Sequence, residues 1–295
     1  MYIDTTSRNG MEESLAHLTG VSIPELYRFI EDEAYSATKE HSWFDMQRFL
    51  ESMKNFFTQR VDQALPDEIL LFHLSRRLNG SEREDGINLS KLLTTNNSFT
   101  EFLNAYKIAF RNGAGNKIIL LYKDKQFSFD ESESTDLKES QKSHVPYLRR
   151  RLGYISGLED FCINGFAFRD LLMKNHYARD LSVCPELLQC VVSFLSPEGL
   201  AEDLKNDYMK KSNYYCFTYK LPLDRVLFDG EEILDVVGKR LDLLTKVAYR
   251  LYQYTGESRY LSDEDNPILR LNDDDIAPVD CLLSAEIITP DMIEW

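Results

Sequence analysis

The chain has 295 residues, of which 49 are acidic and 34 are basic, so its formal charge is −15. Its apolar share of 43% and charged share of 28% are ordinary for a folded protein and exclude a disordered one. The acidic balance also argues against a protein that coats duplex DNA by charge alone, although a local basic groove is compatible with it.

The N-terminal part of the sequence is expected to be helical. Ser22 and Glu25 have the spacing of a capping box at the start of one helix. Apolar residues then recur at helical spacing from Ser42 to Leu65, before a proline. The pattern predicts a helical N-terminal region over residues 1–66, packed on an α+β domain over residues 67–295.

The pattern changes at Glu68. The run Ile69–Leu74 is short and continuously apolar, which is typical of a buried strand. Ser98 is expected to cap a later helix, with Glu101 at its third position. The next predicted elements are helices over 89–93 and 98–106, a hairpin over 117–129 and a charged loop over 130–143.

The second half of the chain mixes strand-like and helical runs. Strands are expected over 161–168, 214–221 and 279–288, and helices over 185–195, 197–211 and 231–254. Because strands and helices do not alternate regularly, the order is typical of an α+β fold with an antiparallel or mixed sheet.

Cysteines and short motifs exclude several classes of site. The five cysteines include no C-x-x-C pair, which favours reduced thiols in a cytoplasmic protein over a disulfide or zinc framework. No run approaches the ~18 apolar residues of a membrane span. Glycine-rich phosphate and dinucleotide motifs are absent, and the five histidines are scattered, so no metal site is expected.

His73 is the unusual histidine, because it lies inside the apolar run. If it is buried it must be hydrogen-bonded, either to a backbone carbonyl or to a ligand. Directly after the apolar run come Ser75, Arg76 and Arg77. A hydroxyl and two guanidinium groups at a strand end suit a phosphorylated ligand.

Several segments resemble the ADP-ribosyltransferase superfamily. They are Phe72–Ser75 followed by Asp85–Ile87, the run Tyr215–Leu221 that leads into Pro222 and Val226, and Ala285–Ile293 with its I-x-P-x-x-I tail. The resemblance covers residues 68–295 in patches. It implies an ADP-ribosyltransferase-like core with a mixed or antiparallel sheet and a helical N-terminal extension. It also implies NAD as the substrate, without a metal.

The resemblance implies roles for the residues of the first strand. His73 would hydrogen-bond the adenosine ribose of NAD, and Ser75 would fix the nicotinamide ribose or its amide. Arg76 or Arg77 would neutralise the pyrophosphate.

The resemblance further implies an aromatic ring that stacks on nicotinamide and a carboxylate that holds its ribose. Tyr154 and Phe166 are candidates for the ring, and Gly165 beside Phe166 would let the backbone approach the ligand. Glu286 fits the family's last strand, whereas Asp280 has the family's spacing before the terminal motif. The two carboxylates, together with His73, are the catalytic candidates.

The resulting hypothesis is an NAD-dependent mono-ADP-ribosyltransferase that modifies a macromolecule, either nucleic acid or protein. Some members of the superfamily are toxins or antiviral defence effectors, so an antitoxin or a regulatory protein is expected as a partner. No membrane partner is expected. The basic segment Lys142–Arg151, with Tyr147, is interpreted either as a nucleic-acid contact or as a solvated helix end. Two other functions stay open: a non-enzymatic acidic interaction module, and a nuclease or phosphotransfer protein that binds magnesium through Asp273–Asp275.

Overall fold

The structure is a computed structural model that describes residues 1–39, 43–130, 137–157, 160–200, 203–230, 234–256 and 261–293. The chain divides into two compact units, each assembled from distant segments. Unit 1 comprises Met1–Phe72, Asn164–Asn175 and Thr218–Arg270; unit 2 comprises His73–Ile163, His176–Phe217 and Leu271–Trp295. The boundary expected between residues 66 and 67 does not coincide with this division, because two later segments pack with the N-terminal helices.

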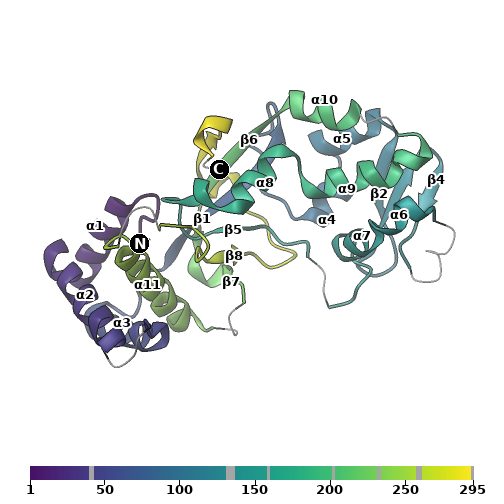
Figure 1. Ribbon diagram of the computed structural model, residues 1–295. Helices are drawn as coiled ribbons and strands as arrows, with labels where there is room; N and C mark the ends of the chain where they lie inside the picture. Colours follow the sequence, from purple (N-terminus) through teal and green to yellow (C-terminus); the bar gives the residue numbers. More distant parts are fainter. Residues whose placement is uncertain are drawn as a thin grey trace. The chain divides into compact units, whose positions relative to one another are not determined.

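Unit 1 contains a group of four helices, drawn together in Figure 1. They are α1 (Arg8–Thr19), α2 (Ile23–Lys39), α3 (Met46–Arg60) and the later helix α11 (Val236–Gln253). Phe49 of α3 packs on Tyr252 of α11, with ring centroids 5.6 Å apart. Because α11 completes the group, the N-terminal helices share their core with a segment about 180 residues downstream.

The predicted capping box at α2 is confirmed. The backbone N–H of Ser22 donates to the Glu25 carboxylate at 2.9 Å, and the Glu25 N–H lies 3.4 Å from the Ser22 hydroxyl. Ser42, where the next helix was expected to begin, lies outside the described residues. The helix α3 begins at Met46, with Asp45 as its N-cap.

The larger sheet has six strands in the order β7-β8-β5-β1-β6-β9. The strands are β1 (Glu68–Leu78), β5 (Asn164–Phe166), β6 (Ser212–Pro222), β7 (Leu227–Phe228), β8 (Ile268–Arg270) and β9 (Leu282–Ile287). In unit 1, β5 pairs antiparallel with β1 and β8, and β8 pairs antiparallel with β7. The chain is therefore an α+β protein with antiparallel sheet pairing, as its sequence predicts.

Unit 2 contains a separate three-stranded antiparallel sheet in the order β2-β3-β4. Its strands are β2 (Ile108–Asn112), β3 (Ile118–Tyr122) and β4 (Lys125–Phe127). The β3–β4 hairpin was expected, and β2 was not. The helices of this unit are α4 (Leu89–Thr94), α5 (Ser98–Ala105), α6 (Glu139–Lys142), α7 (Val145–Arg151), α8 (His176–Val183), α9 (Glu186–Leu195) and α10 (Asp203–Lys211).

Two local predictions in unit 2 are wrong. The cap of α5 is Asn97 rather than Ser98, because the Asn97 side chain accepts the Thr100 N–H at 3.0 Å. The charged loop expected over 130–143 lies partly outside the described residues, but its last part forms α6. Gln141 of α6 is buried and donates to the Phe194 carbonyl at 3.0 Å, so this polar segment is anchored to α9.

Gly165 is required by close packing between β5 and β1. A Cβ atom at this position would lie 2.6 Å from the Phe72 carbonyl oxygen and 2.7 Å from a methyl of Leu71. Both distances are well below van der Waals contact, and a backbone carbonyl paired in a sheet has little freedom to move.

Gly165→Ala is therefore expected to lower the free energy of unfolding by about 1–3 kcal/mol. Urea denaturation of the full chain measures it. Gly256→Ala is the control, because its Cβ would meet nothing nearer than the Gln253 carbonyl at 3.4 Å. An equal, small change in both variants would contradict the close packing.

Candidate functional site

The predicted nucleotide-binding residues of β1 alternate between the two faces of the strand. Asn79 donates its N–H to the Lys211 carbonyl at 2.9 Å, and Leu223 donates its N–H to the Asp67 carbonyl at 3.0 Å, so β1 and β6 are antiparallel in a fixed register. This register places His73 opposite Phe217, and their ring centroids are 6.3 Å apart. The set called here the His73 face comprises His73, Ser75, Arg77, Tyr215 and Phe217.

Arg77 packs across the His73 face. Its guanidinium lies 4.5 Å from the centroid of the Phe217 ring, a cation–π contact. It also donates to the carbonyl of Glu84 at 3.0 Å and of Ser81 at 3.4 Å. His73 and Ser75 are half-buried beside it. An imidazole, a hydroxyl, a guanidinium and an aromatic ring thus share one surface.

Arg76 lies on the other face and is committed to the protein. Its guanidinium donates to the carbonyls of Ser182 at 2.7 Å and Ser212 at 3.0 Å, and to the Ser212 hydroxyl at 3.2 Å. Burial lowers the pKa of Arg76 below its ordinary value. Because these donors already have acceptors and point away from His73, Arg76 is not placed to bind a pyrophosphate with it.

Glu286 also lies on the face opposite His73. Ile288 donates its N–H to the Tyr214 carbonyl at 2.8 Å. Residues 282–287 of β9 come before Ile288 in the sequence, whereas most of β6 comes after Tyr214. The two strands can pair along their length only if they run in opposite directions, so β9 is antiparallel to β6. Ile288 and Glu286 then point to the Tyr214 face, and the Glu286 side chain is exposed.

Asp280 lies in a short 3₁₀ turn, Val279–Cys281, where the start of a strand was expected. This segment is tied to the loop after β1: Val279 donates its N–H to Asp85 at 2.7 Å, and Gly86 bridges to Ala277. The same loop accepts the hydrogen bonds of Arg77. Of the two candidate carboxylates, Asp280 is therefore the one connected to the His73 face.

The aromatic candidates lie elsewhere. Tyr154 is buried in the core of unit 2, edge-on to Phe129 with ring centroids 5.6 Å apart. Phe166 belongs to unit 1, is 6% exposed, and pairs with Phe72 across β1 and β5. Phe217, which the sequence did not single out, is the ring beside His73. Only the β1–β6 register could have identified it.

Residues 145–151 of the basic segment form α7, and the charge of this helix is partly balanced. Arg151 pairs with Asp160, and Arg150 lies 3.5 Å from the same carboxylate. Tyr147 is half-buried and packs against the hydrophobic core of unit 2, and this burial raises the pKa of its hydroxyl. These contacts favour the solvated helix end over a nucleic-acid contact.

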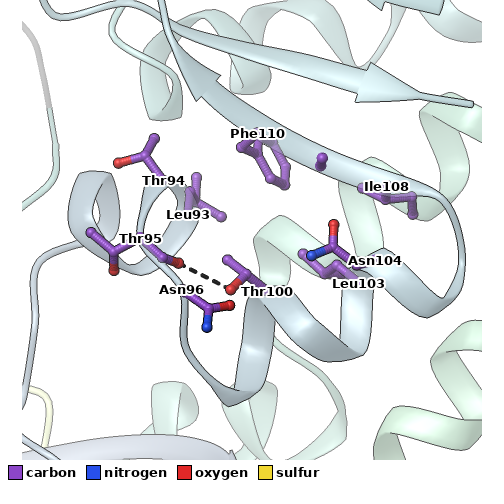
Figure 2. Close-up of a pocket in the computed structure, with 10 residues that line it drawn as sticks. Leu93, Thr94, Thr95, Asn96, Thr100, Leu103, Asn104, Ile108 and Phe110 are labelled. Carbon is purple, nitrogen blue, oxygen red and sulfur yellow. Dashed lines mark hydrogen bonds between the residues drawn. The ribbon is translucent and has the colours of Figure 1, made fainter. Parts of the chain in front are cut away.

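A small cavity of about 190 Å³ lies in unit 2 between α4, α5 and β2, apart from the predicted site. Figure 2 shows threonine, asparagine and apolar side chains around it, with the Thr100 hydroxyl donating to the Thr95 carbonyl at 3.0 Å. Its volume is below the ~300–1,000 Å³ of typical ligand sites, and it carries no charged side chain. It is too small for a dinucleotide.

Unit 1 contains a buried charged cluster that sequence reasoning missed. Arg250 of α11 is 1% exposed and pairs with Asp263, which is fully buried. Asp263 also accepts from Asn266 at 2.9 Å and Asn175 at 3.2 Å. Burial, opposed by Arg250 and the two amides, holds the pKa of Asp263 above its ordinary value. The sequence signal that could have revealed this cluster is Arg250, an arginine on the apolar face of the helix α11.

Within the described ranges, no group of three or more His, Cys, Asp or Glu side chains could hold a metal ion. No helix in that part of the chain is long and apolar enough to cross a membrane. No protein-family model, curated protein or solved structure matches the chain.

Proposed function

We propose that this protein is an NAD-dependent mono-ADP-ribosyltransferase that binds its dinucleotide against the His73 face. The observation that carries the proposal is the shared orientation of His73, Ser75 and Arg77, with Phe217 opposite His73. The resemblance of the surrounding segments to the ADP-ribosyltransferase superfamily supports the same ligand.

Each group on this face has a role in the proposed complex. His73 and Ser75 hydrogen-bond ribose hydroxyls, and Arg77 faces the pyrophosphate, replacing Arg76 in that role. Phe217 provides an aromatic surface for a planar ring.

The proposed reaction breaks the bond between nicotinamide and ribose, which develops positive charge on the sugar. A carboxylate beside the ribose stabilises that charge. Asp280 is preferred over Glu286 for this role, because its segment contacts the loop that holds Arg77. The ADP-ribose is then transferred to a nucleic acid or a protein, as in toxin and defence enzymes of this type.

Nicotinamide release from NAD tests the proposal. The full chain is incubated with NAD, alone and with RNA, DNA or cell protein as acceptor, and nicotinamide is quantified by chromatography. His73→Ala is expected to lower the rate by about 10²-fold, because it removes a preorganised hydrogen-bonding group. His176→Ala, an exposed histidine on α8, is the matched control and should retain full activity.

The carboxylates are tested in the same assay. Asp280→Asn is expected to lower the rate strongly, whereas Glu286→Gln should leave it unchanged. No nicotinamide release and no NAD binding by calorimetry would refute the function. Activity that survives His73→Ala would refute the site.

A further inference from the structure

The strand β9 forms one edge of the six-stranded sheet. In the part of the chain that the structure describes, β6 is its one ladder neighbour. Leu283 is 51% exposed and Ile287 is 50% exposed, which is high for large aliphatic side chains. They flank Ala285 at period two, so the three residues point to one face of the strand.

The backbone of the same three residues faces away from β6. Ile288 uses its N–H to pair with Tyr214, so Glu286 and Ser284 also direct their polar backbone groups toward β6. The intervening residues Leu283, Ala285 and Ile287 direct theirs to the open edge. An added strand would therefore find three N–H donors and three carbonyl acceptors in a row.

This edge has little of the usual protection against pairing, and its one charged side chain is that of Glu286. Natural sheets shield their edges with lysine, proline or bulges, and residues 282–287 contain no lysine, arginine or proline. An unshielded edge with exposed aliphatic side chains favours addition of another strand.

The charge around β9 selects the partner. Residues 271–295 contain seven acidic residues and no basic one. Among them, Asp280, Glu286 and Asp291 are exposed before, within and after the strand. A second copy of this chain would bring acidic segments together, whereas a basic segment would be attracted.

We propose that β9 is a docking edge for a basic, extended peptide segment that adds as a strand beside Leu283, Ala285 and Ile287. Its side chains alternate: apolar residues cover Leu283 and Ile287, and lysine or arginine residues lie on the face of Glu286. This binding does not depend on the proposed NAD chemistry, since it uses the open backbone edge of β9. The side chains of Leu283, Ala285 and Ile287 lie on the same side of the sheet as Tyr215 and Phe217, because Glu286 points to the opposite side.

A fluorescent peptide of sequence KVKVKVK is the probe, and EVEVEVE is its charge-reversed counterpart. Fluorescence anisotropy with the full chain is expected to show that KVKVKVK binds and that EVEVEVE does not. Ala285→Pro removes one outward N–H without touching the β6 ladder and should weaken binding about tenfold or more. Ala285→Ser, which keeps that N–H, is the matched control and should bind normally.

Two further variants keep the test valid if the proline variant does not fold. Glu286→Lys should weaken binding of KVKVKVK and allow EVEVEVE to bind. Leu283→Ser/Ile287→Ser should weaken binding of KVKVKVK. Val183→Ser, a similarly exposed aliphatic residue on α8, is the control for that pair. Glu286→Lys should not alter nicotinamide release, because Glu286 points away from the His73 face.

Residue-resolved hydrogen exchange supplies the decisive readout. The amides of Leu283, Ala285 and Ile287 should exchange fast in the free protein and slowly with the peptide, while Ile288 stays slow in both. Equal binding of both peptides, unchanged binding by Ala285→Pro, or self-association of the chain through β9 in sedimentation would each overturn the proposal.

Discussion

Replacing Asp263 by alanine is expected to lower the free energy of unfolding by about 3–5 kcal/mol, because it removes the nearer of the two buried carboxylates that pair with Arg250 and leaves only Asp170, at 3.7 Å. Both side chains are essentially inaccessible to water. The variant also removes the acceptor of the Asn266 and Asn175 amides. Chemical denaturation of the full chain, monitored by circular dichroism, measures the loss.

Two controls separate this effect from simple truncation. Asp265→Ala removes an exposed carboxylate two residues away and should change stability by less than about 0.5 kcal/mol. The triple variant Asp170→Asn/Arg250→Met/Asp263→Leu removes all three buried charges and should recover much of the loss, since it leaves no isolated buried charge. A single-variant loss below about 1 kcal/mol would contradict the buried pair.

Arg76→Met is expected to destabilise the protein by about 2–3 kcal/mol, the second-largest effect, because it leaves buried carbonyl groups without donors. Arg76 donates to Ser182 and Ser212 from the middle of unit 2 and receives the Tyr208 hydroxyl on its own carbonyl. The substitution keeps the aliphatic volume, so the loss reports the hydrogen bonds. Thermal and urea unfolding both measure it.

Arg77→Met is the matched comparison on the neighbouring position. It loses a cation–π contact and two hydrogen bonds at the surface, at an expected cost of about 0.5–1 kcal/mol. In the NAD assay the order should reverse: folded Arg76→Met retains nicotinamide release, and Arg77→Met loses it. A larger stability loss in Arg77→Met would contradict the alternation of β1.

Local sequence patterns determined much of the secondary structure. The Ser22–Glu25 capping box, the apolar run that forms β1 and the β3–β4 hairpin each depend on residues close together in the chain. The α+β class follows from their order. Errors occurred where polar segments gain structure from distant contacts, as in α6, whose Gln141 binds Phe194 of α9.

Only the tertiary structure decided which residues of the candidate site share a face. The sequence grouped Arg76 with Arg77 and left Glu286 and Asp280 equivalent, because alternation within one strand does not reveal its register with another. The β1–β6 and β6–β9 pairings separate Arg76 and Glu286 from His73 and bring Phe217 to it. The division into two units and the burial of Arg250 beside Asp263 likewise depend on contacts between segments far apart in the chain.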